Sequence, residues 1–497
     1  MGFSFGRNRR NGAEAMSGEA QSSRFEQDDQ IVVMKFGGTS VENAAAIKRL
    51  IQIVSRYQGI QPVVVVSALA RVTDQLLDAG RSAAAGHLGS ALNTVRNIYV
   101  RHEEVADSLV TGSAYAELDR ALRIEFQALE VLLQQLESSR ELDLKGQDQL
   151  LGFGECFSSR MVAAALRETG VEATHADARS CIVTDGRHGQ ASPLWDPTNQ
   201  RIRQALVPLL QAAKVPVLGG FIASTAEGVP TTLGRGGSDF SASIVGAALG
   251  ALRIEIWTDV DGVMTTDPKL CADARVIRKM SFDEAAELAH FGAKVLHPAT
   301  LVPAMRENIP VHVLNSRKPE ADGTVIVART PRQSKKVSAI TTKRNVVAVE
   351  ISAPHGVDSA LLGKLFGVFD EHSCHVDVMG ASLGRVSLLV GSTQALPEIA
   401  AKLSDHADVR WENHRALVCL VGENIRRDAE VASRVFATVA DLDVKVLCQG
   451  ASDRTISFLV EESKAQESVQ RLHRVFFPNA ESVHDWGGIS SAFCQAG

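Results

Sequence analysis

The chain lacks several features that mark common protein classes. None of its apolar runs approaches the ~18 residues that span a bilayer, and its first thirty residues hold acids and arginines but no apolar signal segment. Aromatic residues make up only 5% of the chain, and the net charge at pH 7 is −6. A mildly acidic chain with few aromatic rings is poorly suited to bind nucleic acid or an anionic membrane surface. We therefore expect no nucleic-acid partner and no membrane partner.

Closely spaced cysteines are also missing. The seven cysteines are scattered, and no two form a Cys-x-x-Cys pair. Zinc sites and disulfide frameworks both need tighter spacing. We interpret these residues as reduced thiols, mostly small core side chains, in a cytoplasmic protein with no metal held by the chain itself. Residues 1–30 are predicted to form a disordered, solvated tail.

The composition of the 497-residue chain is that of a globular protein, and its length favours about three domains. Residues 31–34 and 62–66 are apolar runs typical of buried strands, and Ile47, Leu50, Ile51 and Val54 between them mark one helix face. Strand, helix, strand predicts a parallel sheet in an open α/β fold over residues 31–330. Further elements are expected as helices over 90–140 and 152–167, strands at 215–218, 254–257, 311–314 and 324–327, and a capping box at 281–284 that opens a helix running toward Phe291.

The C-terminal part contains an internal duplication. After a polar linker at 330–336, two similar units each carry Gly-Ala-Ser, at residues 380–382 and 450–452, with a strand starting four residues after the serine. Each is read as a βαββαβ unit of about 70 residues, over 337–410 and 411–485. Such units usually pair edge to edge, which favours a ligand site or a dimer contact. Two plain packing modules remain the alternative.

The first chemical motif is Lys-Phe-Gly-Gly-Thr-Ser at residues 35–40. It lies between the first strand and the first helix, where Gly37 and Gly38 let the backbone approach a ligand and helix N-terminal amides favour an anion. Lys35 adds a positive charge at the end of the strand, where open α/β sheets bind ligands. Neither common glycine-rich nucleotide motif occurs in the chain. The alternative is that Lys35 is a solvent-exposed lysine beside a tight turn.

A second glycine loop, Thr-Leu-Gly-Arg-Gly-Gly-Ser-Asp at residues 232–239, precedes an apolar helix expected over 240–249. The planar guanidinium of Arg235 suits a carboxylate or phosphate. Asp239 could orient a lysine or hold Mg²⁺, or it could simply cap the helix. Two glycine loops in one sheet, each with a cation, favour a polyphosphate bound between them.

Further polar residues extend this site. Glu155 is expected to open the helix after Gly-Phe-Gly, where it could receive an α-ammonium group while Arg235 binds an α-carboxylate; a carboxylate favoured by the helix dipole is the alternative. Ser67 and Thr73 follow the second strand as hydroxyl donors. Residues 258–262 could line a nucleotide's base and sugar or form a turn, and Lys294 could meet phosphate or be solvated.

Taken together, the motifs at residues 35–41, 154–155, 234–239, 258–262 and 291–298 occur in the order typical of one family. The chain resembles the aspartokinases of the amino-acid-kinase fold, and its two C-terminal repeats resemble their tandem ACT domains. The resemblance covers about residues 31–477. Because no dinucleotide fingerprint is present, we expect a monofunctional enzyme rather than a fusion with a dehydrogenase.

The resemblance implies a role for each matching residue. Lys35 resembles the lysine that neutralises the transferred phosphoryl group, and Asp239 the aspartate that positions it. Met264 stands where relatives commonly have tyrosine, and Lys269 where they often have arginine. The implied aspartate-binding residues are Ser67, Thr73, Glu155 and Arg235. The implied nucleotide-binding residues are Lys35, Gly37, Gly38, Gly234, Gly236, Gly237, Ser238, Thr258, Asp259, Met264, Lys269 and Lys294.

The implied reaction is ATP-dependent phosphorylation of the β-carboxylate of L-aspartate to 4-phospho-L-aspartate, with Mg²⁺, as the first step of the aspartate-derived amino-acid pathway. The paired ACT units imply feedback inhibition by lysine or threonine, with lysine slightly favoured, and a homodimer or homotetramer through these units. The implied effector site holds Leu361, Leu362, Val376, Asp377 and Ser382. Lysine-sensing bacterial relatives often have Ser-Glu where this chain has Ser382-Leu383. A kinase for glutamate or acetylglutamate, and a catalytically silent amino-acid sensor, remain as alternatives.

Overall fold

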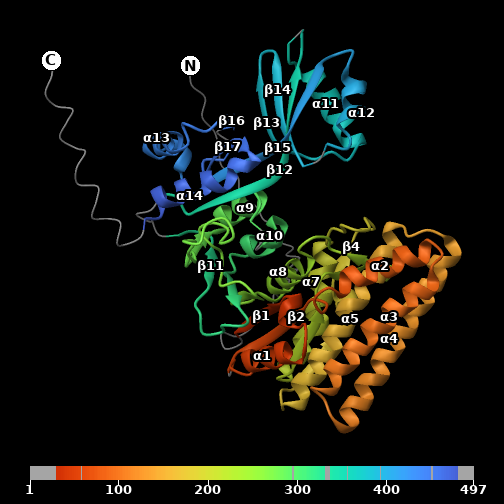
Figure 1. The fold of residues 1–497 in the computed structure, drawn as a ribbon. Coiled ribbons are helices and arrows are strands. Elements are labelled where there is room, and N and C mark those ends of the chain that lie inside the picture. The colour runs from red at the N-terminus through yellow and green to blue at the C-terminus, as the bar shows by residue number, and fades with distance from the viewer. Residues whose placement is uncertain are drawn as a thin grey trace, which may run out of the picture.

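The computed structural model describes residues 30–478, apart from residues 58, 294–295, 331–335, 355, 392 and 449–451. A large α/β region, coloured red to green in Figure 1, carries the first two-thirds of the chain, and a second sheet with its own helices follows in blue. The predicted fold class, an open helix-flanked sheet followed by two ferredoxin-like ACT units, is confirmed. Within the described ranges, no helix is both long and apolar enough to cross a membrane.

The large sheet has eight strands in the order β3-β5-β2-β1-β8-β10-β11-β9. All its neighbours pair in parallel except β10 and β11. The strands at its centre are buried on both faces, which explains their continuous apolar runs. The strand bounds are β1 Ile31–Phe36, β2 Gln61–Val66, β3 Ala173–Ala176, β5 Val215–Gly219, β8 Arg253–Thr258, β9 Lys279–Ser281, β10 Val311–Asn315 and β11 Thr324–Val327.

Alternate side chains of β1 point into two different cores. Val32 and Met34 pack into a cluster with helices α1 to α5, whereas Ile31 and Val33 pack into a cluster with α7 to α10. This is the two-residue period of a strand covered on both sides. The helix bounds are α1 Ala44–Val54, α2 Val72–Ala84, α3 Leu88–Asp107, α4 Gly112–Ser139, α5 Leu144–Glu168, α6 Ala178–Cys181, α7 Trp195–Gln211, α8 Gly237–Leu249, α9 Phe282–His290 and α10 Pro298–Arg306.

Two helix expectations need correction. The helical stretch expected over 90–140 is two helices, α3 and α4, which run side by side in Figure 1. The helix expected at 152–167 begins at Leu144, because the Asp143 side chain caps it by accepting from the amide of Gly146. By contrast, the capping box of Ser281 and Glu284 at the start of α9 is confirmed. A small sheet of β4 (Val183–Thr184), β6 (Ile222–Thr225) and β7 (Pro230–Thr232) lies over the carboxyl ends of the large one.

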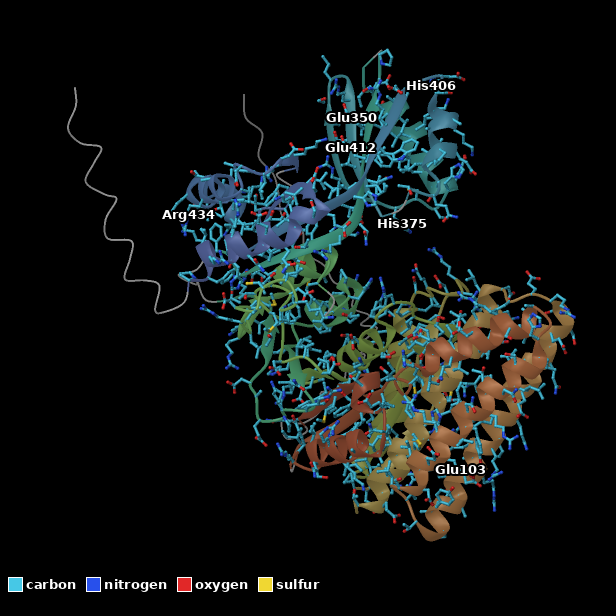
Figure 2. All side chains as sticks on the ribbon, in the orientation of Figure 1. Glu103, Glu350, His375, His406, Glu412 and Arg434 are labelled. Atoms are coloured by element: carbon cyan, nitrogen blue, oxygen red, sulfur yellow. The ribbon has the colours of Figure 1, made fainter. Side chains whose placement is uncertain are left out.

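The C-terminal region is one six-stranded sheet in the order β13-β14-β12-β15-β17-β16. Its two central strands, β12 (Ala339–Ser352) and β15 (Asp408–Val421), pair along 14 residues each, and Figure 2 shows Glu350 of β12 and Glu412 of β15 close together. The other elements are α11 Ser359–Glu371, β13 Val376–Ser382, β14 Arg385–Val390, α12 Leu396–Leu403, α13 Ala429–Thr438, β16 Lys445–Cys448, β17 Thr455–Glu461 and α14 Ala465–Phe476.

The two repeats share these long strands. Residues 347–352 of β12 pair with β14, whereas residues 339–343 pair with 417–421 of β15, which in turn pairs with β17. The start of β12, which the prediction assigns to the first repeat, therefore packs with the second, and Ile340 lies in the second repeat's core. Because the sheet continues across them, the boundaries at 337–410 and 411–485 stay a prediction.

Phe157 offers a test of the helical layer. It is fully buried on α5 and stacks on Phe126 of α4, with ring centroids 4.0 Å apart. We expect Phe157→Ala to lower the free energy of unfolding by about 3–5 kcal/mol, because it leaves a cavity between two helices. Urea unfolding, followed by circular dichroism, measures this change in the free energy of unfolding. The control is Ile124→Ala on α4, where the side chain is 62% exposed and a change below about 0.5 kcal/mol is expected; equal losses in both variants would contradict this packing.

Candidate functional site

The first glycine loop is fixed against the loop that follows β2. The amide of Ser67 donates to the carbonyl of Phe36, and the amide of Ala70 donates to the carbonyl of Gly38. A Cβ atom on Gly38 would lie 3.0 Å from the carbonyl oxygen of Ala68, so a larger residue would push the two loops apart. Lys35, the second-last residue of β1, is thereby held at the carboxyl edge of the sheet, as expected.

The second glycine loop runs from β7 into α8. Gly234 and Gly236 both have left-handed backbones, with φ of 72° and 73°, which only glycine adopts without strain. A Cβ atom on Gly236 would lie 2.7 Å from Cβ of His297. Helix α8 begins at Gly237 rather than at residue 240, with Gly236 as its N-cap and no side-chain cap. Asp239 therefore lies inside the first turn and does not cap the helix. The alternative that this residue serves only as a helix cap is removed.

The two loops meet through one ion pair. Nζ of Lys35 lies 2.6 Å from Oδ1 of Asp239, and the two side chains are 11% and 14% exposed. At this burial the pair is poorly screened by solvent, so each charge fixes the other in place. The structure thus brings together two loops that lie about 200 residues apart in the sequence.

A cavity of about 430 Å³ opens around this pair. Several residues that the sequence did not single out also line it, among them Arg71, Asp74 and Phe221. Arg71 has a left-handed backbone at the start of α2, directly after the loop that carries Ser67, and its position in that loop was the available signal. The predicted site residues that line the cavity are Lys35, Gly38, Ser67, Thr73, Glu155, Gly234, Gly236, Gly237, Ser238 and Asp239.

Glu155 lies in the middle of α5, not at its start, so the helix dipole does not explain it. The residue is 3% exposed. Its Oε1 accepts from the amide of Ala68 at 3.1 Å, whereas its buried Oε2 has no hydrogen-bond partner. Burial raises the pKa of Glu155 to about 8, against the opposing effects of hydrogen bonds from backbone amides and of the charge on Lys35. A buried polar oxygen without a partner is costly, so Oε2 is available to pair with a group of a ligand.

Other predicted residues lie outside the cavity lining. Arg235 is exposed on the second glycine loop, and Gly37 lies between Lys35 and Gly38. Thr258 is the last residue of β8, the neighbour of β1, and Asp259 follows it; Asp259 and Lys269 are exposed. Met264 forms a bridge with Val276. Lys294 lies outside the described residues.

Contacts at the ends of β8 and β10 were missed by the sequence analysis. Asp261, in a loop for which nucleotide binding and turn chemistry were both left open, accepts from Nδ2 of Asn315 at 2.5 Å and pairs with Lys318 at 2.7 Å. Ser316 bonds the buried hydroxyl of Ser40 at 2.8 Å. These contacts tie the 258–262 loop to the first glycine loop, and no local sequence pattern could show them because they join strands far apart in the chain.

The predicted effector residues lie in the first repeat. Oδ1 of Asp377 on β13 is 2.7 Å from Nζ of Lys343 on β12, and Oδ2 of Asp377 is buried without a partner. Val376 and Leu362 pack against the core of this repeat. Leu361 lies at the start of α11, where its amide donates to Asp358, and Ser382 is exposed at the end of β13.

The regulatory sheet directly contacts the catalytic region. The hydroxyl of Thr341 on β12 donates to the carbonyl of Phe291, and a Cβ atom on Gly292 would lie 3.0 Å from the carbonyl oxygen of Thr342. On the other side of the same sheet, Thr265 bonds Nε2 of His473 on α14 at 3.0 Å. Both contacts involve segments that carry predicted nucleotide-binding residues.

Two glycine loops, a paired lysine and a buried carboxyl group with a free oxygen are the parts expected of a phosphoryl-transfer site for a small charged acceptor. The amino acid kinase family model matches residues 30–315, and an ACT domain model matches residues 418–476. Chloroplastic aspartokinase 1 of Arabidopsis thaliana is 34% identical over 479 residues, covering 90% of this chain and 80% of the relative. Lysine-sensitive aspartokinase 3 of Escherichia coli K12 is also 34% identical, covering 90% of this chain and 99% of the relative.

Solved structures agree with these matches. Escherichia coli aspartokinase III in complex with aspartate and ADP (R-state) superimposes with a TM-score of 0.79 at 33% identity, covering 90% of this chain and 100% of that one. The same enzyme in complex with lysine and aspartate (T-state) gives a TM-score of 0.75, covering 90% and 99%. The chain belongs to the amino acid kinase family, and within it to the aspartokinases.

The raised pKa of Glu155 predicts a pH dependence of stability. The folded protein holds this proton up to about pH 8, whereas the unfolded chain releases it near pH 4.5. Glu155 therefore makes stability fall as pH rises between these values, by at most about 1.4 kcal/mol per pH unit. We expect the melting temperature of wild type to fall more between pH 5.5 and pH 8.5 than that of Glu155→Gln. The control is Glu168→Gln, exposed at the end of the same helix; if Glu155→Gln follows the wild-type profile, the carboxyl does not titrate as described.

Proposed function

We propose that the protein transfers the γ-phosphoryl group of ATP to the β-carboxylate of L-aspartate, giving 4-phospho-L-aspartate and ADP. One observation carries the proposal: the Lys35–Asp239 pair lines the same cavity as the buried carboxyl of Glu155, whose Oε2 has no partner. The first group suits a transferring phosphate, and the second suits the ammonium group of an amino acid.

The chemistry needs charge stabilisation more than proton transfer. The β-carboxylate of aspartate has a pKa of ~3.9, so it is already an ionised nucleophile at pH 7 and requires no general base. Its oxygen attacks the γ-phosphorus, the bond to the β-phosphate oxygen breaks, and ADP leaves with that electron pair. Lys35 offsets the charge on the transferred group, Asp239 holds the lysine in place, and the amides of the two glycine loops bind the phosphate oxygens.

The acceptor and the nucleotide are assigned to separate sets of residues. For the acceptor, Glu155 binds the α-ammonium, Arg235 the α-carboxylate, and Ser67 and Thr73 donate hydroxyl hydrogen bonds. For the nucleotide, the glycine loops and Ser238 bind phosphate, and segments from the end of β8 onward hold the rest. That second set comprises Thr258, Asp259, Met264, Lys269 and Lys294.

Mg²⁺ is proposed to arrive with ATP. Among the described residues no cluster of three or more His, Cys, Asp or Glu could hold a metal ion. This fits a Mg²⁺ ion that is held mainly by substrate phosphates and water, with a single carboxylate such as Asp239 beside it. When bound, the ion would withdraw charge from the phosphates.

The compartment and assembly are also proposals. We place the protein in the cytoplasm because its described cysteines, Cys156, Cys181, Cys271, Cys374 and Cys419, are free thiols. A homodimer or homotetramer is proposed through the ACT units, since β13 is an outer strand of its sheet with exposed positions that another chain could cover.

Release of ADP with L-aspartate tests the function, and Lys35→Ala tests the site. We expect wild type to release ADP with aspartate and not with glutamate or acetylglutamate, and Lys35→Ala to lose about a hundredfold or more in kcat, as for loss of one transition-state donor. The control is Lys48→Ala, exposed on α1, which should keep wild-type turnover. A folded Lys35→Ala enzyme with near wild-type kcat would refute the assignment, and glutamate-dependent release would favour the related kinases.

Inhibition by an amino acid is proposed through the first repeat, because β12 carries both Lys343, the partner of Asp377, and the residues that contact the Phe291–Gly292 loop. We expect millimolar lysine, and more weakly threonine, to raise the melting temperature and lower ADP release. Asp377→Asn should weaken this response, since the carboxylate is the natural partner of an effector's ammonium group. Asp370→Asn, exposed on α11, is the control. No effect of either amino acid on wild type would end the sensor proposal.

A further inference from the structure

Asp148 is a buried carboxylate that the mechanism above does not use. It is 1% exposed. The hydroxyl of Thr232 donates to its Oδ1 at 2.5 Å, and the amide of Gly189 donates to both oxygens at 3.0 and 3.1 Å. Nδ1 of His188 lies 2.8 Å from its Oδ2. Because a carboxylate only accepts hydrogen bonds, this arrangement places the hydrogen on Nδ1 of His188.

Burying a carboxylate costs free energy, and removing its hydrogen-bond partners leaves an unpaired buried charge. An apolar side chain would fill the same space between helix and loop at lower cost. Three donors from two separate segments therefore indicate that this carboxylate holds those segments in a fixed relation.

The two segments that Asp148 joins both support the second glycine loop. Thr232 is the last residue of β7, two positions before Gly234, and its carbonyl accepts from the amide of Ala191. Gly234 rests on the other segment, since a Cβ atom there would lie 3.0 Å from Cγ of Gln190 and 3.2 Å from the carbonyl oxygen of Gly189. Asp148 thus fixes both the strand that enters the loop and the wall on which the loop lies.

Arg235 depends on this support more than Asp239 does. Asp239 belongs to α8, and the buried side chains of this helix pack into the core on one face of the large sheet. Arg235 is exposed and lies between two residues with left-handed backbones, Gly234 and Gly236, next to the contact with Gly189 and Gln190. A shift of the 188–190 segment would therefore move Arg235 before it moved the Lys35–Asp239 pair.

Asp148 also belongs to the same rigid element as Glu155. The two residues are seven positions apart on α5, which places them on one face of the helix, two turns apart. One helix thus presents the carboxyl that faces the cavity and the carboxylate that holds the loop carrying Arg235.

We propose that Asp148 is a positioning residue that sets Arg235 opposite Glu155, and so determines affinity for the amino-acid acceptor rather than the rate of phosphoryl transfer. The inference rests on the proposed function, in which Arg235 and Glu155 bind the two α-groups of aspartate. Asp148 acts through Thr232 and the 188–190 segment and touches no substrate.

Asp148→Asn tests the proposal by ADP release in the full-length enzyme. The amide removes the charge and puts a donor where Thr232 or Gly189 donates, so the loop should loosen. We expect KM for aspartate to rise at least tenfold, with kcat within threefold and KM for ATP within twofold of wild type. A merely structural role would instead reduce the folded fraction, lowering kcat with KM unchanged. Asp185→Asn, which affects a turn in the same loop, is the matched control and should leave all three constants unchanged.

A second background separates action through Arg235 from a general disturbance. In Arg235→Ala, whose KM for aspartate is already raised, adding Asp148→Asn should increase KM less than twofold, because residues that act as one unit are not additive. Thr232→Val should reproduce the rise in KM for aspartate, whereas Thr232→Ser should have the wild-type KM. These two variants keep the test available if Asp148→Asn fails to fold.

Three outcomes would overturn the inference: an unchanged KM for aspartate in Asp148→Asn, a rise equally large in the Arg235→Ala background, or wild-type behaviour of Thr232→Val. Failure of the proposed function is distinct from these, since wild type would then release no ADP with aspartate.

Discussion

The ion pair between Lys35 and Asp239 is the contact on which the site depends. Each loop that carries one of the two charges is seated against a neighbouring segment by a glycine where a Cβ atom would be crowded: Gly38 against Ala68, and Gly236 against His297. The parallel sheet supplies the rest, since β1, β2 and β8 all end at the same edge. The position of each charge therefore depends on the backbone of its loop as well as on its own side chain.

Strand β12 connects this arrangement to the regulatory sheet. One of its residues, Lys343, pairs with Asp377, while its neighbours Thr341 and Thr342 contact the Phe291–Gly292 loop. The backbone of Gly292, with φ of 110°, fits against the strand only because no side chain intervenes. A ligand that competed for Asp377 would release Lys343 on the strand that supports this loop. In the proposed regulation, the partner of Asp377 and the contacts with the loop lie within three consecutive residues of β12, so no long relay of side chains is needed.

Local patterns in the sequence predicted much of the fold. The apolar runs of β1 and β2, the helix face of Ile47 and Leu50, and the capping box at Ser281 are all set by near neighbours, and all are confirmed. What the sequence could not show depends on distant residues. The start of α5 at Leu144 was missed because glycines at 146, 152 and 154 weaken the helical pattern, although tight packing requires the last of them: a Cβ on Gly154 would lie 2.7 Å from that of Ala68. The pairing of residues 339–343 with the second repeat was missed because their position in the sequence assigned them to the first.

The candidate site, like the fold, was predicted only in part. Residue types and glycine spacing predicted the loops, Lys35 and Glu155, but Glu155 was expected at the start of its helix and lies in the middle, which removes the helix dipole as the alternative explanation. Its actual setting explains more, because α5 carries two buried carboxyl groups that differ in one respect. Asp148 has donors on both oxygens, whereas Glu155 has an oxygen that the folded chain leaves without one. A fold can retain a fully satisfied buried carboxylate for positioning alone, whereas a buried carboxyl oxygen without a partner carries a cost that a bound ligand can offset. The contrast on a single helix therefore supports the two proposed roles, in which Asp148 holds the site and Glu155 binds the substrate.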